Sequence, residues 1–345
     1  MIAHCEVGGE SLHFLAIETS CDETAAAIFT DEPRILANVV ASQTDLHARF
    51  GGVVPEVAAR AHLERLLPVI DDALKQANIR LDQVGCIAVH HTPGLVGALL
   101  VGVSAAKMLS VALGVPLVGV NHIEGHIYAC RLAAGRDIFP CVGLVVSGGH
   151  TTLYHCPSSL RFEILGATLD DAAGEAFDKV ASLLGLGFPG GPAVERAAAR
   201  GNPAAFKLPR SFLREDRLDF SFSGLKTAVL YSITGQGKSG PTPALSPQTR
   251  ANLAASFQRA VVDVLVEKSR QALRKTGLHT LAVGGGVAAN RVLRTSLNQM
   301  VQEEKAELHV PPPELCTDNA AMAAQAVEKW RAGLFAPLDL DATPN

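Results

Sequence analysis

The amino-acid sequence predicts an α/β protein built from two similar units, and three observations support this fold class. The segments 14–29 and 142–154 each contain two short apolar runs around a polar turn, which is typical of two strands joined in a hairpin. Helix and strand patterns alternate after each hairpin. The chain has 345 residues, 48% of them hydrophobic, which is enough for two domains with cores of their own. If the units face each other, the two polar turns lie across one cleft.

The elements of the first half follow from local signals. The first hairpin is expected to pair strands at 14–20 and 25–29 through the polar turn Cys21 to Thr24. Pro55 suits the first turn of a helix, and Pro68 is expected to kink that helix. The remaining expected elements are the helix itself over 55–78, a strand at 86–89 and a Pro-Gly-Leu turn at 93–95.

One apolar stretch, Leu99 to Val120, has about the length that spans a bilayer. Lys107 lies in its middle, and Gly114 and Pro116 interrupt it. A charged residue inside a membrane span is costly, and Pro116 begins a short β-branched run. We therefore predict a buried helix followed by a strand, and no membrane span.

The second half shows a similar order of elements. Its hairpin turn is Ser147-Gly148-Gly149-His150, and Gly277 ends the best helical pattern of the chain, which begins near Thr249. The other expected elements are helices at 170–184 and 193–200 around a turn at 188–192, an exposed loop at 235–247, and a strand at 281–283 that ends in Gly284-Gly285-Gly286 before another helix.

Composition limits the function classes. The net charge is −4 and 19% of residues are charged, so contact with a nucleic acid requires a local basic patch. Seven cysteines without a CxxC pair argue against a disulfide framework or a zinc ribbon and favour a reducing, cytoplasmic setting. Residues 1–12 lack the features of a signal peptide and are expected to form an N-terminal extension.

Asn121-His122-Ile123-Glu124-Gly125-His126 is the most informative motif. Histidines four residues apart lie on one helical face, about 5 to 6 Å apart at Cβ, and can hold one metal ion. In zinc proteases a glutamate directly after the first histidine is the general base, but here that residue is Ile123. Glu124 is expected to point away from both imidazoles, so the metal would act as a Lewis acid or a template. The alternative is that both histidines only form local hydrogen bonds.

Other candidates are weaker when they are taken singly. The turn Ser147-Gly148-Gly149 offers backbone N–H groups to a phosphate, or it is a plain hairpin turn. The glycine run 284–286 lets a ligand approach the backbone, while Asn290 either binds a base or caps a helix. The roles of three carboxylates stay open. Asp178 and Glu195 either accept hydrogen bonds from ribose hydroxyls or are solvated helix charges. Asp318 is either a third metal ligand or a helix cap.

Together these motifs resemble the TsaD family, tRNA N6-adenosine threonylcarbamoyltransferases formerly called O-sialoglycoprotein endopeptidases. The resemblance covers about residues 14–335. The matching segments are 17–24, 51–56, 93–95, the His122/His126 pair, 146–151, 171–179, 220–227, 284–286 and 316–319. It implies an actin-like ATPase (ASKHA) fold of two RNase H-like lobes with a nucleotide cleft between them. Residues 13–115 with about 316–345 would form the first lobe, and 116–315 the second.

The resemblance also implies the reaction and its residues. A threonylcarbamoyl group would pass from threonylcarbamoyl-AMP to the N6 amine of the adenosine 3′ of the anticodon in tRNAs reading ANN codons, with release of AMP. One divalent metal, Fe(2+) in the family's usual description, would bind His122, His126 and Asp318. The adenylate would bind Val145, Val146, Ser147, Gly148, Gly149, Asp178, Gly191, Glu195 and Asn290. The implied partner proteins are TsaB and TsaE, with TsaC as the source of the adenylate. No residue is assigned as a general base.

The sequence departs from the usual family pattern in places, and functions other than tRNA modification are alternatives. His90-His91-Thr92 stands where the family usually has Thr-Ala-Gly, and His90 and His91 are expected to point to opposite faces of a strand. A kinase or ATPase of the same superfamily, a metallopeptidase and a non-catalytic subunit are the alternatives. The tRNA-facing candidates are basic residues in the loop-rich segment, which would otherwise be solvated: Arg200, Lys207, Arg210, Arg214 and Arg217.

Overall fold

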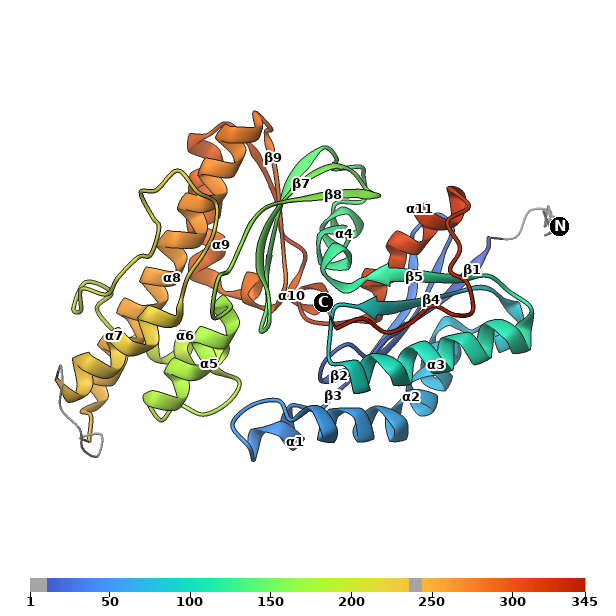
Figure 1. Ribbon diagram of the computed structural model, residues 1–345, viewed down its shortest axis with the longest axis horizontal. Coiled ribbons are helices and arrows are strands. Elements are labelled where there is room, and N and C mark those ends of the chain that lie inside the picture. Colours follow the sequence, from blue (N-terminus) through green and yellow to red (C-terminus); the bar gives the residue numbers. More distant parts are fainter. Residues whose placement is uncertain (1–10, 236–243, 345) are drawn as a thin grey trace. The chain divides into compact units, whose positions relative to one another are not determined.

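A computed structural model describes residues 11–235 and 244–344 (Figure 1). These residues form two compact units. The first unit contains the chain up to Gln43, Pro55–Gly125, and the chain from Asn319 onward; the second contains Thr44–Val54 and His126–Asp318. Most of the predicted N-terminal extension and most of the predicted 235–247 loop lie outside the described residues.

The first unit is built on a five-stranded sheet of order β3-β2-β1-β4-β5. The strands are β1 (His13–Glu18), β2 (Glu23–Thr30), β3 (Ile35–Ser42), β4 (Val84–Thr92) and β5 (Leu117–Asn121). Strands β1, β2 and β3 are antiparallel neighbours, while β1, β4 and β5 run parallel. The predicted first hairpin is confirmed, with its turn at residues 19–22, and β3 was not predicted.

Two long helices, α2 (Pro55–Ala77) and α3 (Val96–Leu113), pack against this sheet and against each other (Figure 1). Helix α2 continues through Pro68. Helix α3 ends at Gly114, whose φ of 66° suits a residue without a side chain. The next segment forms β5, so the predicted helix followed by a strand is confirmed. Among the described helices, α3 alone has the length and composition of a membrane span, and one of its faces packs on β4.

The second unit repeats the topology of the first. Its sheet has the order β10-β9-β6-β7-β8, with antiparallel β6, β7 and β8 and parallel β6, β9 and β10. The strands are β6 (Cys141–Val146), β7 (Thr151–Ser158), β8 (Arg161–Ala167), β9 (Thr280–Gly284) and β10 (Glu307–His309). Each sheet therefore begins with an antiparallel meander and is extended by two parallel strands. The prediction of two similar units that open with a hairpin is confirmed.

The helices of the second unit enclose its larger core. Helix α8 (Pro247–Thr276) is capped by Ser246, whose hydroxyl accepts from the Thr249 N–H, and it ends at Gly277 as predicted. Its apolar stripe packs with α5 and α6 and with the sheet. The other helices of this unit are α1 (Thr44–Ala48), α5 (Ala173–Leu183), α6 (Gly190–Ala198), α7 (Ser223–Thr234), α9 (Arg291–Glu303) and α10 (Pro313–Cys316).

Several predicted boundaries differ from the structure; helix α6, for example, begins at Gly190, inside the predicted turn 188–192. Helix α5 begins at Ala173 and not at Asp170, because the Asp170 carboxylate accepts hydrogen bonds from the backbone N–H groups of Phe222 and Ser223 at the start of α7. Strand β5 pairs with β4, and the first compact unit continues to Gly125. Helix α4 (His122–Ala134) therefore begins in the first unit and ends in the second.

Candidate functional site

Helix α4 carries both histidines of the predicted metal motif. Asn121, the last residue of β5, accepts hydrogen bonds from the N–H groups of Ile123 and Glu124 and so holds the first turn of α4. Within this continuous helix His122 and His126 lie one turn apart, and both are buried. The His126 Nε2 atom lies 3.3 Å from Asp318 Oδ1. The ligand atoms of His122, His126 and Asp318 lie within 4.8 Å of one another.

This set of donors fits a divalent metal ion. Two imidazoles and one carboxylate are a common donor set for Zn(2+) or non-haem Fe(2+) with open positions. The Asp318 side chain retains 19% exposure, which leaves the site accessible from one side. Asn319 and not Asp318 is the N-cap of the following helical turn, so the capping alternative does not account for Asp318. Glu124 is bonded to Gln325 and takes no part in the group.

A buried carboxylate, Glu18, contacts this group and was not predicted. Glu18 ends β1, His90 lies near the end of β4, and His122 follows β5, so neighbouring parallel strands bring all three to one sheet edge. Glu18 Oε2 lies 2.6 Å from His90 Nδ1 and 3.0 Å from His122 Nδ1. Burial opposes ionisation of Glu18, but the charges of His90 and His122 outweigh it and hold the pKa of Glu18 well below its usual range. The only signal in the sequence is an acidic residue at the end of an apolar strand.

The predicted opposition of His90 and His91 matches the structure. The His90 side chain is fully buried against Glu18. His91 points away from it, since its Nδ1 atom lies 3.4 Å from the Asp341 carbonyl oxygen near the C-terminus. His91 therefore does not join the histidine cluster.

The Ser147-Gly148-Gly149 turn lies at the N-terminus of α5. Ser147 closes the turn, because its N–H donates to the His150 carbonyl and its hydroxyl accepts from the His150 N–H. The carbonyl oxygens of Ser147 and Gly148 accept from the N–H groups of Gly174 and Glu175 in the first turn of α5. A Cβ atom on Gly148 or Gly149 would meet nothing within 4 Å. The turn thus presents open backbone beside the positive end of a helix dipole.

The triple-glycine turn lies directly against β6. A side chain on Gly285 would collide with the carbonyl oxygen of Val146, and Gly285 has a φ of 95°. Gly286, by contrast, faces open space. Asn290 caps α9 by accepting from the Leu293 N–H at 3.0 Å, and its amide donates to Gln258 at 2.9 Å. The capping alternative for Asn290 is therefore what the structure contains.

Two carboxylates connect the remaining turns of the second unit. Asp178 in α5 accepts from the Gly190 N–H at 2.7 Å and so holds the start of α6. Glu195 in α6 accepts from the Arg291 N–H at 2.9 Å at the start of α9. Gly191 faces open space between these contacts. These contacts link α5 with α6 and α6 with α9, and all nine predicted adenylate-binding residues belong to the second unit: Val145, Val146, Ser147, Gly148, Gly149, Asp178, Gly191, Glu195 and Asn290.

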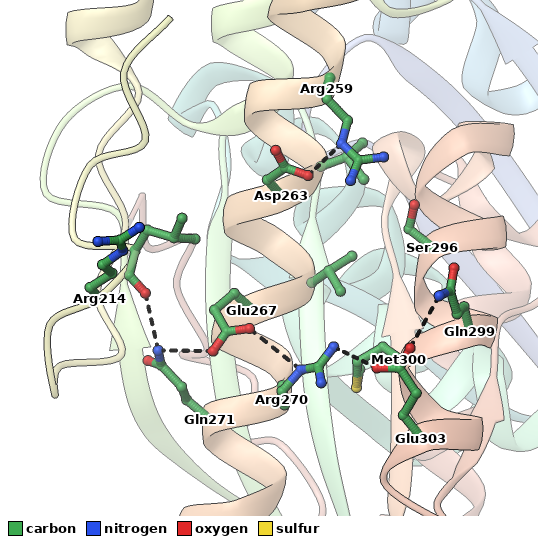
Figure 2. Close-up of a pocket in the computed structure, with 13 residues that line it drawn as sticks. Arg214, Arg259, Asp263, Glu267, Arg270, Gln271, Ser296, Gln299, Met300 and Glu303 are labelled. Carbon is green, nitrogen blue, oxygen red and sulfur yellow. Dashed lines mark hydrogen bonds and ion pairs between the residues drawn. The ribbon is translucent and has the colours of Figure 1, made fainter. Parts of the chain in front are cut away.

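A cavity of about 580 Å³ lies elsewhere in the second unit, between α8, α9 and the segment at Leu213 and Arg214 (Figure 2). Its charged side chains pair with one another: Arg259 Nε lies 2.6 Å from Asp263, and Arg270 lies 3.0 Å from Glu303. Figure 2 shows Arg259 and Asp263 side by side on α8, while Arg270 reaches from α8 toward Glu303 on α9. None of the predicted metal- or adenylate-binding residues lines this cavity. This cavity is therefore separate from the predicted metal and adenylate sites.

The basic segment does not present all of its charges to solvent. Arg210 pairs with Asp263 at 2.8 Å, and Arg217 pairs with Asp219 at 2.7 Å and lies over the Phe212 ring. Arg200, Lys207 and Arg214 are exposed. Only the latter three remain as candidates for contact with phosphates.

The chain is similar to several known proteins. Residues 34–325 match the TsaD family, described as tRNA N6-adenosine threonylcarbamoyltransferase. Proteins of that name from Rhodopirellula baltica and Symbiobacterium thermophilum are 51% and 55% identical; the matches cover 96% of this chain in both cases, and 96% and 95% of the relatives. Among solved structures, T. kodakarensis HypF has a TM-score of 0.61 at 15% identity and covers 96% of this chain and 50% of its own. Component A of (R)-2-hydroxyglutaryl-CoA dehydratase from Acidaminococcus fermentans has a TM-score of 0.52 at 14% identity, covering 93% and 100%. At such identities these structures show a shared fold.

Proposed function

Because the chain belongs to the TsaD family of tRNA N6-adenosine threonylcarbamoyltransferases, we propose that it modifies tRNA by threonylcarbamoyl transfer. The group would pass from threonylcarbamoyl-AMP to the N6 amine of the adenosine 3′ of the anticodon in tRNAs reading ANN codons. The observation that carries this proposal for this chain is the group of buried His122, buried His126 and partly buried Asp318, which has the donors of a metal centre. We further propose that the two units are the lobes of an actin-like ATPase fold and that the protein acts in the cytoplasm, where its tRNA substrate is found.

The nine predicted adenylate-binding residues of the second unit form the proposed adenylate site. The open backbone of Gly148 and Gly149, at the positive end of α5, suits the phosphate of the adenylate. Asp178 and Glu195 each use one carboxylate oxygen in a backbone contact, and a carboxylate can accept further hydrogen bonds from ribose hydroxyls. Asn290 holds the start of α9, so its contribution is to position the triple-glycine turn.

His122, His126 and Asp318 are the proposed ligands of one divalent metal ion, which we take to be Fe(2+). When bound, such an ion supplies a Lewis acid for the carbamoyl oxygen. In the transfer itself, the N6 amine forms a bond to the carbamoyl carbon, the bond from that carbon to the phosphate oxygen breaks, and the amine loses a proton. AMP is a good leaving group, so orientation by the Ser147 and Gly285 turns supplies much of the acceleration.

The direct test is a transfer assay with defined components. Purified protein, threonylcarbamoyl-AMP labelled in threonine, tRNA and the partner proteins should yield labelled tRNA and AMP in equal amounts. A tRNA whose target adenosine is replaced by guanosine is the matched control, because it lacks the N6 amine. Phosphoryl transfer from ATP to an acceptor, with no label on tRNA, would favour the kinase alternative instead.

We propose that the partner proteins TsaB and TsaE contribute to the reaction and that TsaB docks on the apolar face of α2 and α3. Leu63 and Leu67 of α2 are 67% and 63% exposed, and Met108 and Val111 of α3 are 54% and 63% exposed. These helices pack side by side, so the exposed side chains belong to one helical layer of the first unit (Figure 1). An exposed apolar surface of this kind is characteristic of a protein interface.

Leu67→Glu is expected to weaken binding of that partner at least about 30-fold, because a buried interface anchor contributes about 2 kcal/mol or more. Sedimentation or calorimetry with purified TsaB measures the effect. Ile164→Glu is the matched control, since Ile164 is also 67% exposed but lies on β8 of the second unit. Equal binding of TsaB by the two variants would contradict this docking face.

The exposed basic residues Lys207 and Arg214 are the proposed phosphate contacts of tRNA. Replacing both with alanine is expected to weaken tRNA binding and to lower the salt slope of log Kd by about 2, since each phosphate contact releases about one counterion. Filter binding at several salt concentrations measures both quantities. Lys75 and Arg80, which are exposed on the first unit, provide a control with the same loss of charge. An unchanged slope in the Lys207 and Arg214 variant would reject the assignment.

A further inference from the structure

We propose that Glu18 is a positioning residue that fixes the ring of His122, so that Nε2 of His122 is the nitrogen that binds the metal ion. This inference rests on the proposed metal centre and deepens it. It gives a role to Glu18, which the sequence motifs did not assign to the site. The observations that carry it are the complete burial of Glu18 and its contacts with two imidazoles.

The Glu18 carboxylate is held by a second contact besides the one with His122. Its Oε1 atom accepts from the Ser20 N–H directly after β1. Its Oε2 atom lies 3.0 Å from His122 Nδ1, which is a hydrogen-bond distance. The Ser20 hydroxyl lies 3.1 Å from the same nitrogen. The carboxylate and the start of α4 are therefore connected through a short and buried set of contacts.

An ionised carboxylate only accepts hydrogen bonds, so this contact determines the tautomer of His122. Nδ1 must carry the hydrogen that it donates to Glu18, so Nε2 is the nitrogen whose lone pair can bind a metal ion. A carboxylate in this position also makes the imidazole a more basic ligand and fixes the ring orientation. Without Glu18, His122 would have either tautomer and a wider range of ring orientations.

His90 gives this chain a second imidazole on the same carboxylate. Its Nδ1 atom lies 2.6 Å from Glu18 Oε2, a contact that does not have the alignment of a hydrogen bond. The His90 and His122 rings meet edge to face, with centroids 5.6 Å apart. His90 Nε2 lies against Gly125 of α4, where a side chain would approach it to 3.1 Å. His90 thus fills the space beside α4 and limits rotation of the Glu18 carboxylate.

Glu18, His90 and His122 also satisfy the distance requirement for a second metal site. The 2.6 Å separation between Glu18 Oε2 and His90 Nδ1 is too short for two ligands of one ion. Two ligands at about 2.0 to 2.2 Å from one tetrahedral ion would lie about 3.4 Å apart. Measured stoichiometry distinguishes the two readings: one metal ion per chain supports positioning by Glu18, and two ions per chain would overturn it.

The main test measures metal affinity of the metal-free full-length protein, without tRNA or partner proteins. Co(2+) and Zn(2+) are titrated in competition with a chromophoric chelator. Glu18→Gln is expected to raise the Kd about 10- to 100-fold, as is common when the carboxylate behind a ligating histidine is lost. Glu124→Gln is the matched control, because it makes the same change on α4, two residues from His122, at a side chain bonded to Gln325. Equal affinities of these two variants would overturn the proposal.

Two further measurements keep the proposal testable if Glu18→Gln folds poorly. His90→Asn retains a donor in the position of Nδ1 but removes the imidazole, and a rise in Kd smaller than that of Glu18→Gln is expected. In the Zn(2+)-loaded wild-type protein labelled with ¹⁵N-histidine, the His122 resonances should identify Nε2 as the metal-bound nitrogen and Nδ1 as protonated. Metal on Nδ1 would overturn the proposal. All of these results are independent of the transfer assay, so a failure of the proposed function is recognised separately.

Discussion

Replacement of His126 with alanine is expected to abolish transfer of labelled threonine to tRNA. His126 is the central residue of the proposed metal centre, because it lies one helical turn from His122 and its Nε2 atom lies 3.3 Å from Asp318. Its loss leaves one imidazole and one carboxylate, which are insufficient to retain a divalent ion with open positions. A Lewis acid contributes several kcal/mol to the stabilisation of developing charge, and each 1.4 kcal/mol corresponds to about a factor of ten in rate. The expected loss is therefore at least about 10³-fold.

The comparison must separate lost chemistry from lost folding, since His126 is fully buried. His126→Gln keeps more of the side-chain volume and should show the same loss of transfer with a smaller change in thermal unfolding. His155→Ala is the matched control, because His155 belongs to the same unit but pairs at its surface with Glu163. It should transfer the label normally. The metal content should fall in both His126 variants and should be unchanged in His155→Ala. Undiminished transfer by His126→Ala would remove the metal mechanism.

The parts of the site that the sequence predicts are those whose geometry is local. His122 and His126 share a face of α4 because of helix periodicity alone, and Gly277 ends α8 because a left-handed residue is needed there. The Ser147 turn follows from a hairpin pattern with glycine at its tip. For Asp318 and the adenylate-binding residues the sequence supplied only weak signals one by one. Their assignment came from the order of motifs along the whole chain.

Glu18 shows why the rest was not predicted. Nothing near Glu18 in the sequence indicates a partner, because its contacts with His90 and His122 depend on the pairing of β1 with β4 and of β4 with β5. Register between distant strands is set by the packing of the whole sheet and not by neighbouring residues. The undetected strands β3, β8 and β10 have a related cause. All three are edge strands whose residues are mostly exposed or only partly buried, so their sequences carry a weaker strand pattern than the buried central strands.

The triple-glycine turn leads to the second prediction with a large effect, since two adjacent glycines in it should respond differently to the same change. Gly285→Ala is expected to lower the free energy of unfolding by about 2 to 4 kcal/mol. Gly285 has a φ of 95°, which a residue with a Cβ adopts only under strain, and that Cβ would collide with the carbonyl oxygen of Val146. Because Val146 leads directly into the Ser147 turn, AMP binding should be lost together with stability.

Gly286→Ala separates the fold of this turn from its proposed contact with the adenylate. Gly286 has no left-handed φ, and a Cβ on it would meet nothing within 4 Å, so the free energy of unfolding should remain close to that of the unchanged protein. If the adenylate occupies that open space, the added methyl group must weaken AMP binding without destabilising the protein. Urea unfolding and calorimetric titration with AMP, carried out on both variants, measure the two effects. Binding of AMP by Gly286→Ala with undiminished affinity would show that the adenylate does not lie against this turn, whatever the result for Gly285→Ala.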